Sequence, residues 1–264
     1  MNELSIVIPC RDDARIEACL KSIDEDLEIV ISLNGSSLQV ERIVSEHAAR
    51  KHLVIIRSSI PNLAAALQAG SLAASSEAIL YMDSDCQFLP GTIRRFRDAL
   101  KHYKVVKGQI IFQSDSWLTA IIAQSREHHT AEQVTAYKPP LAINRSIKEQ
   151  IGGYFFDSRL FWREDSDLDY RIRKAGIPIY MEKEAAITHP PLRLWQDLRS
   201  AYRYGVGLVR AEFFNIHLTE VPRSVLSTYQ SKGMMPAFYM CLRNAIYVCG
   251  EITEHAKLSL GSNQ

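Results

Sequence analysis

The sequence has no excess of charge of either sign, because 31 Lys and Arg residues balance 30 Asp and Glu residues over 264 positions. Proteins that hold nucleic acid by bulk charge are clearly basic, so the composition argues against a nucleic-acid partner. The five cysteines are odd in number and form no C-x-x-C pair. This argues against a zinc site and a disulfide framework, and favours free thiols in a reducing compartment.

Long apolar runs and low-complexity stretches are also missing. The nearest approach, Met234–Gly250, is interrupted by Pro236, Arg243 and Asn244, so no transmembrane helix is expected. The N-terminus enters a strand-like segment at once, and no signal peptide is expected. A cytoplasmic protein is therefore predicted. With 47% hydrophobic residues, the chain is able to bury a large core without staples.

The first 112 residues alternate short β-branched runs with helix-like stretches. Strands are predicted at Leu4–Pro9, Glu28–Leu33, Leu53–Arg57, Ala78–Met82 and Val105–Phe112. Asn62 is a predicted N-cap for an Ala-rich helix between two of these strands. The alternation predicts an α/β fold with a mainly parallel sheet that helices cover on both faces.

Polar segments follow three of the predicted strands, at residues 10–12, 34–35 and 83–85. Ligands bind beyond the carboxyl ends of such strands, so these segments are expected to converge at one edge of the sheet. Where the chain turns, Asp83 and Asp85 can approach one ligand together. One carboxylate can then reach a ribose hydroxyl and the other a divalent cation on a diphosphate.

A second acidic cluster begins a predicted helix over residues 165–175. Four acids fall within six residues there: Glu164, Asp165, Asp167 and Asp169. They can form an acidic first turn that complements the helix dipole, or one of them can be a general base for a sugar hydroxyl. Further along, His189 ends a short predicted strand, where an imidazole can be structural or can bind Mn²⁺.

In their order along the chain, these motifs resemble a family-2 glycosyltransferase with the GT-A fold. The matching stretches are Leu4–Pro9, Ile31–Ser37, Ala64–Gly70, Ile79–Asp85, Gly152–Tyr154, Glu164–Arg171 and His189. The resemblance implies inverting transfer of a sugar from a nucleotide-activated donor, usually a UDP-sugar, with a divalent metal such as Mn²⁺ or Mg²⁺.

The resemblance also implies roles for single residues. Those on the donor side are Pro9, Cys10, Arg11, Asn34, Asp83, Ser84 and Asp85. Asp83 would lie near the ribose, while Asp85 and His189 would hold the metal. Asn34 stands where the family often has an acid that reads the base.

On the acceptor side, Asp165 matches the general base of the family, and Tyr154, Trp162 and Glu164 are assigned to acceptor binding. The resemblance does not identify the acceptor: a small molecule, a lipid-linked sugar and a peptide-derived molecule all stay open.

The segment Ala64–Gly70 departs from the family, because Leu67 and Gln68 stand where a basic residue and Asn are often found. A cation for the diphosphate must then come from elsewhere. Three arginines share a face of a predicted C-terminal helix and can supply it or form a solvated face: Arg199, Arg203 and Arg210. Gly205 and Gly207 are expected to weaken or bend that helix.

Residues 1–190 are expected to form the GT-A domain, with a nucleotide-sugar half at 1–112 and an acceptor half at 113–190. Residues 191–264 are expected to be a helical extension. The aromatic and Met-rich segment Met234–Val248 suggests peripheral membrane contact, and a packed helix that completes the core is the alternative.

Two other functions account for parts of the pattern. A sugar-nucleotide pyrophosphorylase has a related sheet but needs a glycine-rich basic loop, whereas Pro9–Asp13 has no glycine and two acids. A lapsed transferase that serves as a nucleotide-sugar-binding partner subunit would be favoured by loss of Asp85 or Asp165. Both acids are present.

Overall fold

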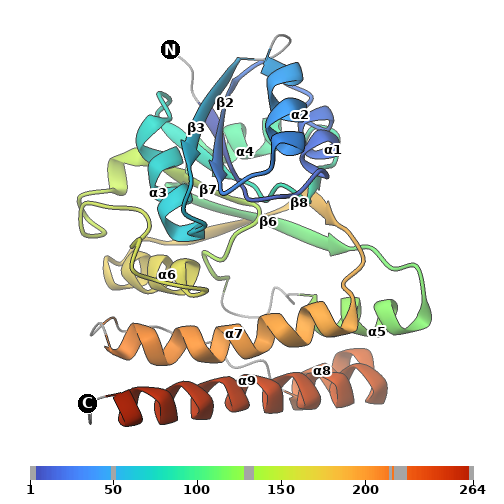
Figure 1. Cartoon of the computed structure of the whole chain (residues 1–264). Helices are drawn as coiled ribbons and strands as arrows, with labels where there is room; N and C mark the ends of the chain where they lie inside the picture. The colour runs from blue at the N-terminus through green and yellow to red at the C-terminus, as the bar shows by residue number, and fades with distance from the viewer. Residues whose placement is uncertain (1–3, 49–51, 128–133, 214–215, 217–224, 262–264) are drawn as a thin grey trace. The chain divides into compact units, whose positions relative to one another are not determined.

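The computed structural model describes residues 4–48, 52–127, 134–213, 216 and 225–261 (Figure 1). The chain forms two compact units. The first unit contains residues 1–111, 129–159 and 164–189, and the second contains 112–128, 160–163 and 190–264. The functional division at residue 190 stays a prediction.

An eight-stranded sheet forms the centre of the first unit, in the order β3-β2-β1-β4-β7-β6-β8-β5. The strands are β1 (Leu4–Cys10), β2 (Glu28–Asn34), β3 (Leu53–Ser58), β4 (Ala78–Tyr81), β5 (Gln87–Phe88), β6 (Val105–Phe112), β7 (Leu141–Asn144) and β8 (Ile179–His189). Strands β3, β2, β1 and β4 are parallel, whereas β7 pairs antiparallel with both β4 and β6. The predicted α/β fold is confirmed, and the antiparallel half adds to it.

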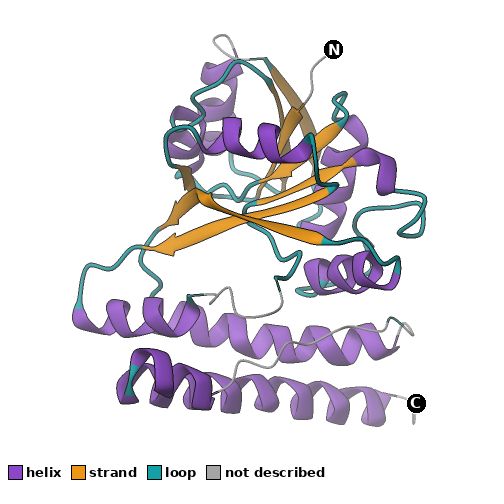
Figure 2. Ribbon diagram, turned by 180° about the vertical axis from the view of Figure 1, so that it is seen from behind, coloured by secondary structure: helices purple, strands orange, loops and turns teal. Residues whose placement is uncertain are grey.

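Helices cover both faces of this sheet (Figure 2). The side chains of α1 (Ile16–Lys21), α2 (Leu38–Ala48) and α4 (Thr92–Leu100) pack in one core cluster with Ile6 and Ile8 of β1. Those of α3 (Leu63–Ala73) and α6 (Glu164–Lys174) pack in the other with Val7. This follows because successive strand residues point to opposite faces. The predicted N-cap is confirmed, since the backbone N–H of Ala65 donates to Asn62 Oδ1 at 2.9 Å.

The second unit is helical. It contains α5 (Trp117–Arg126), α7 (Leu194–Phe213), α8 (Val225–Lys232) and α9 (Met234–Gly261). At its centre the buried carboxylate of Asp197 accepts a hydrogen bond from Tyr239 Oη at 2.7 Å and pairs with Arg126 and Arg243. Within the part of the chain that the structure describes, no helix has both the length and the apolar character needed to cross a membrane.

Glycines bring α7 and α9 into close contact. A Cβ atom on Gly205 would lie 2.1 Å from the carbonyl oxygen of Tyr247, and one on Gly250 would lie 2.1 Å from that of Tyr202. A Cβ on Gly207 would likewise meet the carbonyl oxygen of Phe161 at 2.3 Å. α7 is one helix of 20 residues that runs through Gly205 and Gly207, and these glycines have a packing role that the sequence did not indicate.

We expect Gly205→Ala and Gly250→Ala each to lower the free energy of unfolding by about 2 kcal/mol or more, because a methyl group at either site collides with backbone that cannot rotate away. Denaturant unfolding measures this. Ser200→Ala, on the same helix, is the control and should change stability by less than about 0.5 kcal/mol. Wild-type stability in both glycine variants would show that the two helices can separate to fit the methyl group.

Candidate active site

The carboxyl edge of β1, β2 and β4 brings the three polar segments together, as the fold topology predicts. Strand β1 lies between the other two, with Cys10 paired to Leu33 and Val7 paired to Tyr81. The hydroxyl of Ser36 donates to the carbonyl oxygen of Cys10 at 3.0 Å. The loops that follow the three strands are thus neighbours.

The predicted donor-side residues differ in their exposure. Pro9 and Cys10 are buried at the end of β1, whereas Arg11 is exposed. Asn34 is buried at the end of β2, and its side-chain amide donates to the carbonyl oxygen of Ser32 at 3.4 Å. Ser84 is half-buried in the loop after β4 and lies beside the thiol of Cys10.

Asp85 is the centre of a charged cluster. Its Oδ2 atom lies 3.6 Å from Nε2 of His189, at the end of β8, and 3.3 Å from the guanidinium of Arg15. Burial raises the pKa of the Asp85 carboxyl above its usual value; His189 and Arg15 oppose this shift, and Asp83 adds to it. A carboxylate in this environment gains stability when a cation binds beside it.

The side chains at this cluster fit a divalent cation. Asp85 and His189 offer one oxygen and one nitrogen, a ligand pair that suits Mn²⁺. Their separation of 3.6 Å lets one ion at about 2.1 Å contact both atoms. The thiol of Cys86 lies within 4.8 Å of both, but it is buried in the apolar core, and Mn²⁺ and Mg²⁺ prefer oxygen and imidazole ligands.

The acids of α6 have different partners. Asp167 pairs with Arg171 at 2.7 Å, and Asp169 pairs with Arg173 at 2.8 Å, each four residues along the helix. Both carboxylates are buried, so they stabilise the fold. Asp165 is half-buried at the second position of the helix. Asp165 is thus the most accessible of the four acids at the start of α6.

Lys138 lies between the two acidic clusters. Its Nζ atom is 3.5 Å from Oδ1 of Asp83 and 3.4 Å from Oε1 of Glu164. Only 5% of the Lys138 side chain is exposed. The donor-side acid and the first turn of α6 therefore meet around one ammonium group.

A second lysine is buried beneath this group. Lys107 Nζ donates to the carbonyl oxygens of Pro139 and Pro140, at 2.7 and 3.3 Å. Burial lowers the pKa of the Lys107 ammonium to about 7, although Asp165 and Asp83 raise it. Lys107 thus fixes the backbone that follows Lys138.

The lowered pKa of Lys107 predicts a pH-dependent stability. Between pH 7 and about 10 the unfolded chain binds the proton more tightly than the folded chain, so this group makes stability rise with pH. Replacing Lys107 with methionine should reduce that slope by up to about 1.4 kcal/mol per pH unit. Denaturant unfolding of both proteins between pH 7 and 8.5 tests this, because the thiols are the same in both and their contribution cancels in the comparison. Equal slopes in both proteins would contradict it.

The predicted acceptor residues lie in both units. In the first unit, the Tyr154 ring packs under the guanidinium of Arg171, 4.1 Å from the ring centroid. In the second, Trp162 has a left-handed backbone (φ 70°), a strained conformation for a bulky residue. Its ring contacts Tyr204 edge-on and Arg203 by a cation–π interaction at 5.1 Å.

Two of the three arginines proposed for the diphosphate have partners within the second unit. Arg203 stacks on Trp162, and Arg210 pairs with Glu254 at 2.6 Å.

In the first unit, Gln68 uses its side-chain oxygen to accept hydrogen bonds from the backbone N–H groups of Phe155 and Phe156.

The family profile described as Glycosyl transferase family 2 matches residues 5–168. This is more than half of the chain and includes the edge of the sheet with Asp83, Asp85 and the first turn of α6. The chain belongs to glycosyl transferase family 2. It is therefore a glycosyltransferase by family, with the α/β fold that the sequence predicted. No curated protein matches the chain significantly in sequence.

Solved structures with the same fold include a mannosyltransferase and TarS. The mannosyltransferase PcManGT from Pyrobaculum calidifontis, in complex with GDP-Man and Mn²⁺, superposes with a TM-score of 0.62 at 16% identity, over 99% of this chain and 80% of that one. TarS from S. aureus gives 0.59 at 15% identity, over 95% of this chain but 55% of that one. TarS 1-349 in complex with UDP-GlcNAc gives 0.57 at 12% identity, over 97% and 92%. These likenesses show the fold alone.

Reasoning from the sequence missed three cations near the candidate site: Lys107, Lys138 and Arg15. The signal was weak for each. Lys138 precedes two prolines that restrict the backbone, but nothing in the sequence indicates which carboxylates it meets. Lys107 lies in a predicted strand, where its burial depends on strands brought beside it by the fold.

Proposed function

We propose that the chain is a metal-dependent, inverting glycosyltransferase that moves a sugar from a nucleoside-diphosphate sugar, with UDP-sugars first, to a hydroxyl group of an acceptor. The observation that supports this most is the meeting of Asp83 and Glu164 at Lys138. Asp83, which we assign to the donor, thus lies near the first turn of α6, and that turn contains the base candidate Asp165. The neighbours in complex with UDP-GlcNAc and with GDP-Man and Mn²⁺ support a donor of this class.

Each residue has a chemical role in the proposal. Asp83 would accept a hydrogen bond from a ribose hydroxyl, and Asp85 and His189 would hold the cation, which when bound would supply positive charge for the diphosphate. Asp165 takes the proton of the acceptor hydroxyl while the oxygen attacks the anomeric carbon from the side opposite the diphosphate, which inverts the configuration.

The proposal also requires both substrates to be held in fixed positions. The protein has to hold the donor and the acceptor in line, because direct displacement needs little else from it. Glu164 and Tyr154 of the first unit, and Trp162 of the second, stay our proposed acceptor contacts. Whether the acceptor is a small molecule, a lipid-linked sugar or a peptide-derived molecule is decided by trials with each class.

Calorimetric titration with UDP, GDP and dTDP, each with and without Mn²⁺, tests the proposal. We expect UDP to bind more tightly when Mn²⁺ is present, and the other two to bind weakly. Binding of GDP or dTDP instead would change the donor and keep the reaction class. If a nucleotide binds but the corresponding nucleotide-sugar is neither hydrolysed nor used for sugar transfer, the chain is a lapsed partner subunit. The absence of nucleotide binding under every condition would contradict the proposal.

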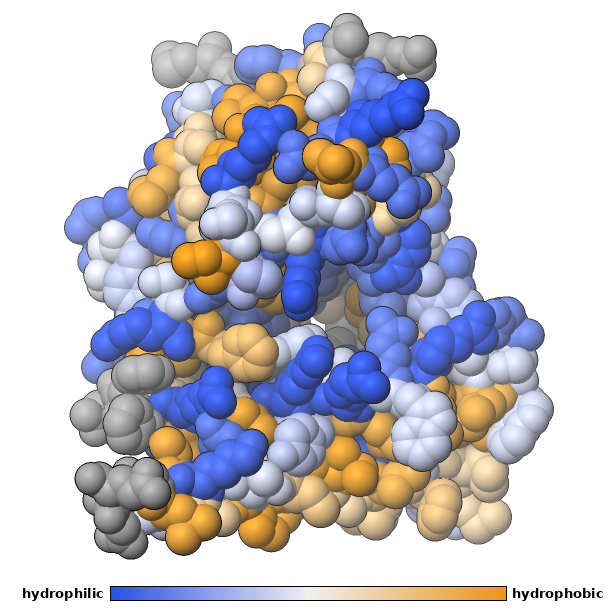
Figure 3. Space-filling view, in the orientation of Figure 1, coloured by the Kyte–Doolittle hydropathy of each residue, from blue (hydrophilic) through white to orange (hydrophobic). Residues whose placement is uncertain are grey.

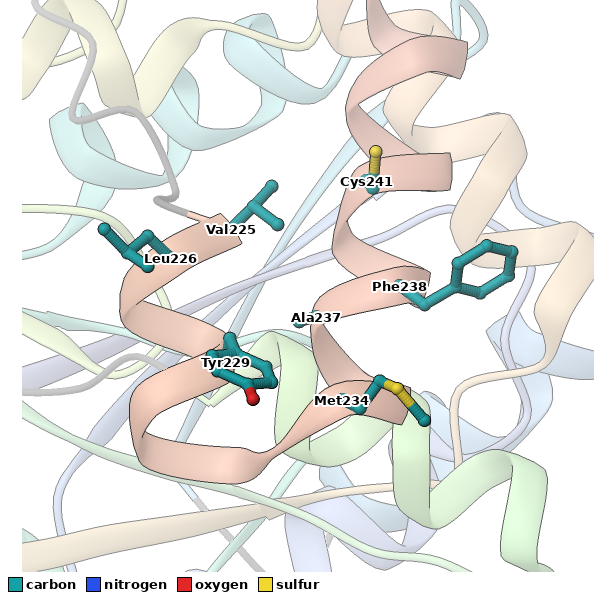
Figure 4. Close-up of a pocket in the computed structure, with 7 residues that line it drawn as sticks. All are labelled: Val225, Leu226, Tyr229, Met234, Ala237, Phe238 and Cys241. Carbon is teal, nitrogen blue, oxygen red and sulfur yellow. The ribbon is translucent and has the colours of Figure 1, made fainter.

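We also propose that α8 and α9 contact a membrane surface from the cytoplasmic side. In Figure 3, orange atoms gather along the lower edge, over α9. The exposed apolar side chains of the two helices include Leu226, Tyr229, Met234, Phe238, Leu242, Val248 and Ile252. Figure 4 shows several of them around a shallow pocket between the helices. Two charged groups of α9 are buried instead, since Arg243 pairs with Asp197 and Glu254 pairs with Arg210, whereas Lys257, near the end of the helix, is exposed.

A surface helix in water normally has its charged side chains toward solvent and its apolar side chains toward the core. Co-sedimentation of the full chain with anionic and neutral vesicles tests this contact, with Phe238→Asp as the variant that should weaken it. Failure to sediment at low salt would contradict membrane contact. A concentration-dependent dimer that Phe238→Asp disrupts would instead assign the face to a second copy of the chain.

A further inference from the structure

Lys138 joins carboxylates from elements that are distant in the sequence. It precedes β7, whereas Asp83 follows β4 and Glu164 is the first residue of α6. Its ammonium lies within 3.5 Å of an oxygen atom of each. An ammonium group is strongly hydrated, so burying it is costly unless opposite charges compensate it. Both carboxylates are thus part of what keeps Lys138 charged in this place.

Hydrogen bonds fix the backbone directly after Lys138. Lys107 Nζ donates to the carbonyl oxygens of Pro139 and Pro140, and the backbone N–H of Gly108 donates to that of Pro140 at 3.2 Å. A Cβ on Gly108 would lie 3.0 Å from Cγ of Pro140, so the chains touch here. The backbone at Pro139 and Pro140 therefore has little freedom to shift. This restricts the position of the neighbouring Lys138 and its ammonium group.

Glu164 depends on this ammonium. Its side chain is buried, and its Oε2 atom has no hydrogen-bond partner among the residues that the structure describes. Removing the charge of Lys138 would leave a buried carboxylate without the cation that faces Oε1, and the first turn of α6 would move to expose it. Asp165 is the next residue, so its position would change with that turn.

We propose that Lys138 is a positioning residue that links the donor-side carboxylate of Asp83 to the first turn of α6, so that donor affinity and the placement of Asp165 depend on one ammonium group. This rests on the proposed glycosyltransferase activity. It also assigns a cation to the donor side, where the segment Ala64–Gly70 supplies none.

The test uses the full chain and two readouts. Nucleotide affinity is measured by calorimetry with UDP or GDP, whichever the wild type binds, in Mn²⁺. Turnover is measured as hydrolysis of UDP-GlcNAc or GDP-Man. We expect Lys138→Met to weaken nucleotide binding about tenfold and to reduce hydrolysis about 10²-fold, because the base is misplaced as well. Lys138→Arg keeps the charge and should recover part of both.

A double-mutant cycle separates positioning from stability. In an Asp83→Asn background, Lys138→Met should have little further effect on nucleotide affinity, whereas in a Glu164→Gln background most of its effect on affinity should remain. Arg97→Met is the matched control. It breaks an ion pair with Glu25 in the same unit, before β2 and thus at the opposite edge of the sheet. It should lower thermal stability and leave both readouts unchanged.

The outcomes are distinguishable. A wild type that neither binds a nucleotide nor hydrolyses a nucleotide-sugar overturns the proposed function. An active wild type whose Lys138→Met variant matches it in both readouts overturns the positioning role alone. Fully additive effects of Lys138→Met and Asp83→Asn overturn it as well. If Lys138→Met does not fold, Lys138→Gln takes its place in the cycle with the same expected pattern.

Discussion

Replacing Asp165 with asparagine is expected to reduce turnover by about 10²-fold or more, while nucleotide affinity stays close to that of the wild type. The reason is that an amide has nearly the shape of a carboxylate but cannot take a proton. Asp165 is half-buried at the start of α6, whereas Asp167 and Asp169 are held by arginines. The measurement is steady-state sugar transfer or donor hydrolysis beside calorimetry.

Asp98→Asn is the control for this experiment, because Asp98 is an exposed acid on α4 and pairs with Lys101 on the surface. It should leave both turnover and affinity unchanged. Wild-type turnover in Asp165→Asn would remove this residue from the mechanism. A large loss of nucleotide affinity in the same variant would show that the substitution disturbs the donor site as a whole.

The second large effect concerns the cation. We expect Asp85→Ala to abolish the enhancement of nucleotide binding by Mn²⁺, because the carboxylate is the charged ligand of the pair that Asp85 forms with His189. The remaining imidazole ligand carries no negative charge and binds the ion weakly by itself. Titration of UDP into the variant with and without Mn²⁺ measures this, and affinity in Mn²⁺ should fall by about tenfold or more.

Two companion variants define the ligand set. His189→Ala should weaken the Mn²⁺ effect and retain part of it, because the carboxylate remains. Cys86→Ser should leave the effect intact, since that thiol is buried in the core. If Mn²⁺ still enhances binding to Asp85→Ala, other residues hold the ion, and the assignment of Asp85 and His189 is wrong.

Much of the fold follows from local patterns. Strands β1 to β4 were predictable because each is a short β-branched run, and the helices between them show helical spacing with clear caps such as Asn62. Their parallel order follows from the alternation. The antiparallel half was not predictable, because it depends on pairings between distant segments, such as Gln87 with Thr188. The contact between α7 and α9 was not predictable either. From the sequence, Gly205 is expected only to weaken or bend α7, and its packing role depends on Tyr247 of α9.

The candidate acids of the site were singled out from the sequence, and their roles stay predictions. Asp83, Asp85 and Asp165 stand at the ends of predicted strands or at the start of a predicted helix, and local position together with side-chain chemistry is enough to single them out. The cations were decided only by the tertiary structure. Lys138 meets Asp83 and Glu164 only because the fold brings both within 3.5 Å of its ammonium group. A charge pair across a sheet leaves no periodic trace in the sequence, because the energy of the pair depends on distance and burial in the folded chain.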